Sequence, residues 1–316
     1  MAGGTNQSYA SNKAQTWARR LIWKLAIATL ALMAVGSATR VMNAGLACPD
    51  WPLCYGQLVP RQQMNLQVFL EWFHRLDAML IGLTTLGLVG FSVWFRGQLP
   101  RWVPWAAGGA LVLIGVQGLL GGLTVTELLR FDIVTAHLGT ALLYFSVLLV
   151  MGVALLPGER LAFSGNVGRL PWLGAIAAFL VYFQSLLGGL VGSRWAAHQC
   201  FGLNQLCAVM NSHLIGVVPA TAATLWLVWR AWQMPALSGA LRQLATAAGA
   251  LVALQVLLGI ATFKLHLQVE PLTVSHQTFG ALLLGCLVCF SALAFRDRAR
   301  AAEANLSAVS ADYDTA

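Results

Sequence analysis

Four histidines of this 316-residue chain lie near the starts of long apolar segments. They occur in E-W-F-H-R (His74), T-A-H-L-G (His137), N-S-H-L-I (His213) and S-H-Q-T-F (His276). Imidazoles carried at matched depth by the helices of a bundle are a typical way to hold haem iron, with two rings for each iron. One carboxylate, Glu71, precedes His74 by three residues and shares its helix face. We therefore expect haem at the histidines and chemistry at Glu71.

The carboxylate breaks the symmetry between two halves of the chain. The matching stretch of the second half has Met210 in place of Glu71 and Leu214 in place of Arg75. A structural role common to both halves would not need Glu71. Such a carboxylate can act as a general base, activate water or stabilise a developing cation. The alternative is an ion pair at the membrane surface with Arg75 or Arg61.

The elements that carry these residues are membrane helices. The chain is 58% hydrophobic and 9% charged, with a mean hydropathy of +0.71, which excludes an ordinary soluble domain. Backbone groups in lipid must be paired within the segment, so long apolar stretches become helices. We predict an all-α integral membrane protein whose eight transmembrane helices occupy residues 21–40, 72–95, 102–124, 134–156, 171–192, 210–232, 241–263 and 274–295.

The net charge is +8, and the placement of the basic residues along the chain indicates the membrane topology. Lys and Arg gather before the first span, after the last, and in alternate connections, which predicts that both termini are cytoplasmic. This distribution gives no reason to expect nucleic acid binding. The first 20 residues do not resemble a transit peptide, so we expect the cell membrane of a bacterium.

An internal repeat divides the chain. V-Q-G-L-L-G-G-L-T-V at 116–125 matches L-Q-V-L-L-G-I-A-T-F at 254–263, and each precedes a histidine helix. We predict two tandem four-helix bundles related by a pseudo-two-fold axis along the membrane normal. The expected parts are an N-terminal tail (1–20), the first bundle (21–156), a linker (157–170), the second bundle (171–296) and a disordered tail (297–316).

Two cysteine pairs lie in loops on the outer, oxidising side, where disulfides persist. We predict the disulfides Cys48–Cys54 and Cys200–Cys207. Short-loop disulfides can be labile, so exchange of Cys48–Cys54 with a partner thiol is one interpretation and a loop staple is the other. For Cys200–Cys207 we favour the staple.

Haem is the favoured metal group, because zinc would need a closed tetrahedral set. The repeat pairs His74 with His137 and His213 with His276. Arg40 and Arg194, at repeat-related outer ends, are candidates to bind haem propionates, and Arg75 is a third. Snorkelling of these side chains to the interface is an equal alternative.

Taken together, E-W-F-H-R at 71–75, the other three histidines, the tandem repeat and the two cysteine pairs resemble the haem A synthase family over about residues 20–296. The resemblance implies oxidation of a methyl group of haem O to a formyl group, with water as the oxygen source. It places the essential glutamate at Glu71 and the substrate haem at His74 and His137. It places a haem b cofactor at His213 and His276, and a redox role at the Cys48–Cys54 pair.

The resemblance also implies partners. Haem O synthase, terminal oxidase assembly factors, an extracytoplasmic thiol–disulfide protein, membrane lipid and a second copy of the chain are the candidates. Three other functions compete. A di-haem b-type cytochrome would carry electrons without using Glu71, a transporter would need polar residues at the membrane midplane, and a haem O prenyltransferase would need Asp-rich motifs that this sequence lacks.

Overall fold

The computed structural model describes residues 3–157, 167–192 and 205–314, and these residues form eight α-helices and no β-strand. Each helix contains a segment long and apolar enough to cross a membrane, which confirms the predicted eight-span, all-α architecture. In chain order the helices are α1 (Gly3–Val41), α2 (Leu66–Trp94), α3 (Trp102–Thr126), α4 (Phe131–Ala154), α5 (Leu170–Val191), α7 (Gln205–Trp232), α8 (Gly239–Lys264) and α9 (Glu270–Asp314).

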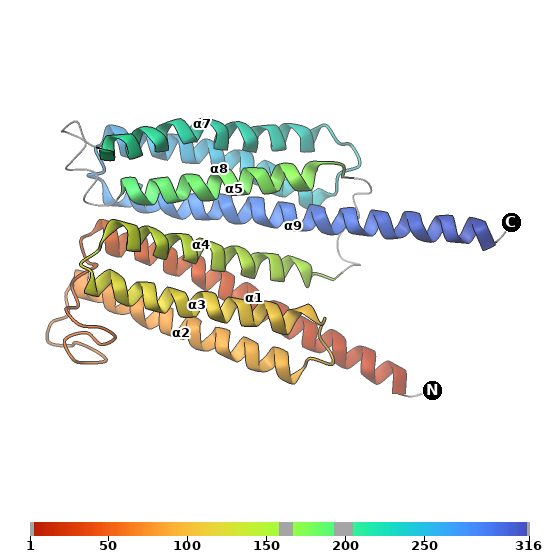
Figure 1. The fold of residues 1–316 in the computed structure, drawn as a ribbon, viewed down its shortest axis with the longest axis horizontal. Coiled ribbons are helices and arrows are strands. Elements are labelled where there is room, and N and C mark those ends of the chain that lie inside the picture. Colours follow the sequence, from red (N-terminus) through yellow and green to blue (C-terminus); the bar gives the residue numbers. More distant parts are fainter. Residues whose placement is uncertain (1–2, 158–166, 193–204, 315–316) are drawn as a thin grey trace.

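The helices form two bundles that lie side by side (Figure 1). In the first, α1 packs on α2, α2 on α3, α3 on α4 and α4 on α1. In the second, α5, α7, α8 and α9 close a ring in the same order. Each bundle has its own core of fully buried side chains, represented by Leu88 and Leu148 in the first and by Leu227 and Leu287 in the second.

The most extensive helix contacts between the bundles are those of α1 with α9, α4 with α5, and α4 with α9. A two-fold axis relating the bundles would exchange the first two contacts and keep the third. The contacts are therefore those that the predicted axis requires, and the axis itself stays a prediction.

The repeat extends to the turns that connect the helices. The α3–α4 turn has Leu128 and Leu129 at φ 51° and 61°, and the α8–α9 turn has His266 and Leu267 at the same two angles. A left-handed conformation is uncommon for residues other than glycine. Two consecutive left-handed residues at matching places in both halves therefore indicate that the halves repeat a backbone design as well as a sequence pattern.

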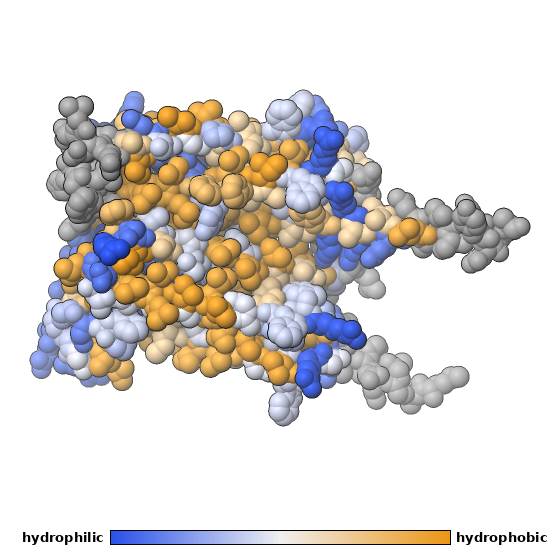
Figure 2. Space-filling view, in the orientation of Figure 1, coloured by the Kyte–Doolittle hydropathy of each residue, from blue (hydrophilic) through white to orange (hydrophobic). Residues whose placement is uncertain are grey.

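On the face seen in Figure 2, apolar side chains occupy the middle of the molecule and polar side chains gather towards both ends. Both termini lie at one end, and so does the α2–α3 connection with Arg96 and Arg101 (Figure 1). The predicted placement of both termini on one side with these basic residues is therefore confirmed. Which side is cytoplasmic stays a prediction.

The first and last helices extend beyond the predicted spans. α9 continues as a helix to Asp314, and α1 begins at Gly3 inside the expected N-terminal tail. The segment after Arg296 is rich in alanine, which has the highest helix propensity. Extending a helix that has already formed also avoids the cost of nucleation. The division of the chain into tails, bundles and linker stays a prediction.

Candidate functional site

The four histidines occupy matching positions in their helices. His74 and His213 are each the ninth residue of α2 and α7, and His137 and His276 are each the seventh residue of α4 and α9. These helices all begin at the end of the molecule opposite the termini (Figure 1). All four imidazoles therefore lie at similar depth near one end, as the sequence predicted.

Each imidazole packs against a glycine of the preceding helix. A methyl group at Gly36 of α1 would lie 2.8 Å from Cε1 of His74. The corresponding distances to Cε1 of His137, His213 and His276 are 3.5, 3.0 and 3.2 Å, from Gly121, Gly188 and Gly259 respectively. In His74 and His213 the Cε1 edge of the ring faces the glycine, with Nδ1 and Nε2 on either side of it.

A second contact fixes three of these histidines. The side-chain amide of a glutamine one turn before the glycine donates a hydrogen bond to the histidine's backbone carbonyl. The distances are 2.8 Å for Gln117, 2.7 Å for Gln184 and 2.9 Å for Gln255. Leu32 occupies this position in α1, so His74 lacks the bond. His74 thus differs from the other three histidines in two ways: it has Glu71 beside it, and it lacks this hydrogen bond.

The geometry of the first pair fits an iron between two imidazoles. The ring centres of His74 and His137 are 6.5 Å apart. Metal–nitrogen bonds of about 2 Å on both sides of an iron place two ring centres roughly 6 Å apart. His213 and His276 hold the matching places in α7 and α9 of the second bundle. Both pairs therefore have the donor chemistry for a haem, and the first has a spacing that suits bis-imidazole ligation.

Glu71 is 4% exposed, and both of its carboxylate oxygens accept hydrogen bonds. Oε2 accepts from the backbone N–H of Cys48 at 2.8 Å, and Oε1 accepts from the guanidinium of Arg75. The ion pair considered as an alternative role is therefore present with Arg75. It holds a buried carboxylate one turn from His74, and so it is compatible with a chemical role.

The α1–α2 loop, residues 42–65, is fastened to the start of α2. Arg75 donates to the carbonyls of Asp50 and Leu53 at 2.6 and 2.5 Å, and the indole of Trp72 donates to the carbonyl of Leu58 at 2.7 Å. In the motif E-W-F-H-R, the glutamate, tryptophan and arginine thus hold the loop while the histidine faces α1. Arg75 remains a candidate propionate partner, although a propionate would compete with these bonds.

The loop also packs near the first histidine pair. The predicted disulfide Cys48–Cys54 is present, with the two Cα atoms 4.8 Å apart. Between the cysteines, the ring of Trp51 packs on Gly122 of α3, 3.3 Å from where a methyl group would lie. The preceding residue, Gly121, faces His137. The disulfide loop therefore rests directly beside the His74–His137 site.

An internal carboxylate shapes this loop. The side chain of Asp50 accepts hydrogen bonds from the backbone N–H groups of Tyr55 and Gly56 at 2.6 and 2.7 Å. The bond from Gly56 is the main cause that holds the pKa of the Asp50 carboxyl below its ordinary value. The bond from Tyr55 and the charge of Arg75 act in the same direction. Tyr55 and Gly56, whose N–H groups donate these two bonds, both have positive φ, and the carboxylate contacts stabilise that conformation.

Comparison with known proteins identifies the relatives of this chain. The sequence family described as cytochrome oxidase assembly protein matches residues 19–288. A haem A synthase of Shewanella oneidensis is 30% identical, over 85% of this chain and 95% of the relative. Haem A synthases of Caulobacter vibrioides and Rhodospirillum centenum are each 29% identical, over 85% and 91% of this chain and 94% and 90% of the relatives. The chain belongs to the cytochrome oxidase assembly protein family.

Several expected site residues of this family member lie elsewhere or cannot be placed. Arg194 and Cys200 lie outside the described residues, as does the side chain of Cys207, so the second disulfide stays a prediction. Arg40 lies against α5 of the other bundle, where its Nη1 donates to the carbonyl of Gly189 at 3.2 Å.

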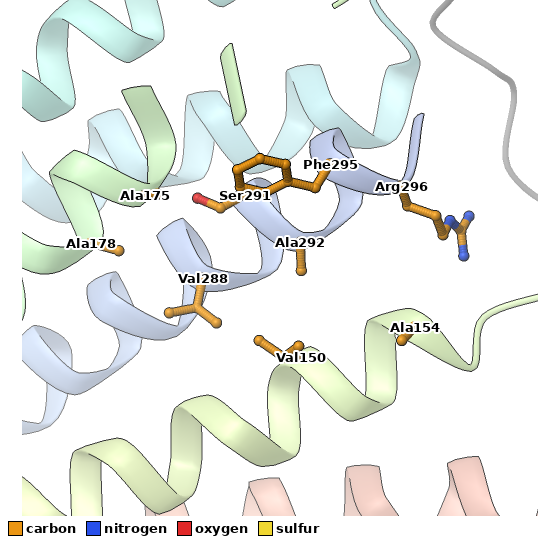
Figure 3. Close-up of a pocket in the computed structure, with 9 residues that line it drawn as sticks. All are labelled: Val150, Ala154, Ala175, Ala178, Val288, Ser291, Ala292, Phe295 and Arg296. Carbon is orange, nitrogen blue, oxygen red and sulfur yellow. The ribbon is translucent and has the colours of Figure 1, made fainter. Parts of the chain in front are cut away.

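A cavity of about 490 Å³ in this cytochrome oxidase assembly protein has none of the four histidines in its lining. It lies between α4, α5 and α9, and its walls are largely apolar with Arg296 at one side (Figure 3). Its lining includes Val150, Ala178 and Val288 and none of the histidines. We therefore do not associate it with the chemistry.

Sequence reasoning missed the four glycines and Gln184. A usable signal was present, because Q-x-x-x-G recurs in three helices that each precede a histidine helix, at 117–121, 184–188 and 255–259. The meaning of the pattern is clear only in the structure, where the glycine that ends it contacts an imidazole.

Proposed function

We propose that this protein is a haem A synthase, which oxidises a methyl group of haem O to a formyl group by successive hydroxylations with water as the oxygen source. The named relatives are haem A synthases, and the chain spans most of their length. The observation that carries the proposal is the inequality of the two histidine pairs. Buried Glu71 lies one turn from His74, whereas Met210 stands at the matching place before His213.

In this proposal His74 and His137 bind the substrate haem, and His213 and His276 ligate haem b. Haem b, when bound, supplies one-electron transfer. Glu71, held by the backbone N–H of Cys48 and by the guanidinium of Arg75, accepts a proton from water or stabilises positive charge at the reacting carbon. The packed glycines and the glutamine bonds orient the imidazoles, and the disulfide loop shields the site from bulk water.

The competing function is a di-haem b-type cytochrome that only carries electrons. Such a protein would need both histidine pairs, but it would have no need for a carboxylate held in one half. The comparisons favour the synthase, because the relatives are named for it. Arg40, Arg75 and Arg194 remain the proposed propionate partners.

The protein is a multi-pass membrane protein, and we place it in the cell membrane with both termini in the cytoplasm. Haem O synthase is the proposed supplier of substrate, and terminal oxidase assembly factors are the proposed receivers of product. An extracytoplasmic thiol–disulfide protein that acts on Cys48–Cys54, and a second copy of the chain, are further proposed partners. The cytochrome oxidase assembly family to which the chain belongs supports the assembly role.

The test is Glu71→Gln, which keeps the size of the side chain and removes its charge. Expressed with a source of haem O, the variant should accumulate haem O and yield about 100-fold less haem A, the usual scale for losing an acid–base group. Glu127→Gln is the matched control, because Glu127 is a half-exposed carboxylate that pairs with Arg130 in the α3–α4 turn. The measurement is chromatography of the extracted haems.

Normal haem A from Glu71→Gln would show that Glu71 has no catalytic role. Absence of haem A from the unaltered protein would reject the synthase assignment itself.

His213→Ala should remove one low-spin haem from the purified protein, and an unchanged absorption spectrum would contradict the haem b assignment.

A further inference from the structure

Arg40 belongs to the first bundle, but its side chain reaches the second. It ends α1 at the outer end, and its Nη1 donates to the carbonyl of Gly189 in α5 at 3.2 Å. Its Nη2 lies 2.7 Å from the place that a methyl group at Gly192 would occupy. Glycine at 192 therefore leaves the space in which the guanidinium rests.

That space lies directly beyond the second histidine pair. Gly188 in α5 and Gly192, the residue that caps α5, are four residues apart and so lie on one face, about 6 Å apart along the axis. The ring of His213 packs on Gly188, with Cε1 3.0 Å from the position of a methyl group there. The guanidinium of Arg40 is thus one turn farther toward the outer end than the His213 imidazole.

A second contact ties the same part of α1 to the other histidine of this pair. Ser37, one turn before Arg40, donates a hydrogen bond to the side chain of Gln277, which follows His276. The outer end of α1 therefore contacts α5 beside His213 and α9 beside His276. Gly36 of the same turn faces His74, so this end of α1 lies between the two histidine pairs.

The charge of Arg40 is uncompensated among the residues that the structure describes. Its Nη2 is buried and has no hydrogen-bond partner there, and no described carboxylate pairs with it. A buried cation without a counter-ion is costly. Arg75, the other arginine near the histidines, differs because Glu71 and loop carbonyls satisfy it.

We propose that Arg40 binds a propionate of the haem held by His213 and His276, so that a helix of the catalytic half completes the cofactor site of the other half. A propionate is a carboxylate, which a guanidinium binds through two parallel hydrogen bonds. The proposal rests on the proposed function for the identity of the second-half haem. It makes the two sites interdependent, because α1 also supplies the glycine on which His74 packs.

The experiment measures the midpoint potential of each haem in the purified full-length protein. His213→Ala identifies the second-half haem by its loss from the absorption spectrum. A nearby positive charge favours the reduced haem, so Arg40→Gln should shift the reduction equilibrium of that haem about tenfold toward the oxidised form, which is about 59 mV for one electron. Arg40→Lys keeps the charge and should show a smaller shift.

Arg296→Gln is the matched control. Arg296 is also a partly buried arginine at the junction of the bundles, where it donates to the carbonyls of Val153 and Leu156 at the end with the termini. Its loss should leave both potentials unchanged. An equal shift in Arg296→Gln, or a shift confined to the haem that His213→Ala retains, would overturn the proposal.

Gly192→Ala supplies a second test if Arg40→Gln no longer holds the haem. The added methyl group displaces the guanidinium but keeps the charge and the fold of α5, since Gly192 has an ordinary φ of −75°. The second-half haem should lose affinity or shift in potential, and unchanged behaviour would contradict the proposal. If the unaltered protein held no His213-dependent haem, the proposed function would fail instead, which is a distinct outcome.

Discussion

At the residue scale, small side chains matter as much as the titratable ones. Each imidazole packs on a glycine. A methyl group added at Gly36 would lie 2.8 Å from the ring, whereas one added at Gly121 would lie 3.5 Å from it. A methyl group closer than 3.0 Å would force its neighbour to move, while 3.5 Å is ordinary van der Waals contact. The rings are therefore held by close packing with different tolerances at the four places.

We predict that Gly36→Ala displaces His74 and lowers haem occupancy of the first site, while Gly121→Ala does not. Both changes gain about 1 kcal/mol of helix propensity, so propensity does not separate them. Haem absorbance per protein, measured in a His213→Ala background, reports this site alone. Equal occupancy in the two variants would show that the imidazole contact at Gly36 has no importance for binding.

At the element scale, α2 carries two functions on one turn. His74 faces α1, while Glu71, Trp72 and Arg75 hold the disulfide loop. The loop in turn packs beside His137 through Trp51 and Gly122. A change in the loop is therefore transmitted to the carboxylate through direct hydrogen bonds.

We predict that the loop loosens in acid. The pKa of Asp50 is lowered in the folded loop, so its contribution to stability is present above the ordinary value of 3.8 and is lost as the pH falls through the folded pKa. Hydrogen exchange of the Tyr55 and Gly56 amides, corrected for intrinsic rates, should show less protection at low pH. Asp50→Asn should remove this pH dependence.

The amide of Val68 provides an internal control for that measurement. It donates to the side chain of Asn65 at 3.0 Å, and this amide acceptor does not titrate. Its protection should stay constant over the same pH range. An Asp50→Asn variant with the same pH profile as the unaltered protein would exclude Asp50 as the origin.

At the scale of the whole molecule, close packing between α4 and α9 joins the bundles. A methyl group at Gly285 of α9 would lie 2.9 Å from Cε1 of Phe145 and 3.1 Å from Cδ1 of Leu149. Together with the α1–α5 contact of Arg40, this junction fixes how the two histidine sites lie relative to one another.

We predict that Gly285→Leu destabilises the protein by about 1–3 kcal/mol, the usual cost of overpacking. Gly87→Leu is the control, because nothing lies within 4 Å of a methyl group there. Thermal unfolding in detergent should show a lower midpoint for Gly285→Leu than for Gly87→Leu. Identical midpoints would mean that the bundles are not held by this contact.

The sequence by itself determined the membrane class, the eight spans, the depth of the histidines, the Cys48–Cys54 disulfide and the inequality of Glu71 and Met210. These features depend on composition, on helical periodicity and on short separations along the chain. The sequence analysis did not predict that α9 continues to Asp314, a course that alanine's helix propensity and the existing helix favour.

Only the tertiary structure decided which residues complete each site. Arg40 and Gly189 are 149 positions apart, and no local pattern indicates that they meet. The glycines under the imidazoles likewise gain their meaning from a neighbouring helix. Periodicity fixes the face on which a residue lies, but the packing of one helix on another fixes which partner that face contacts.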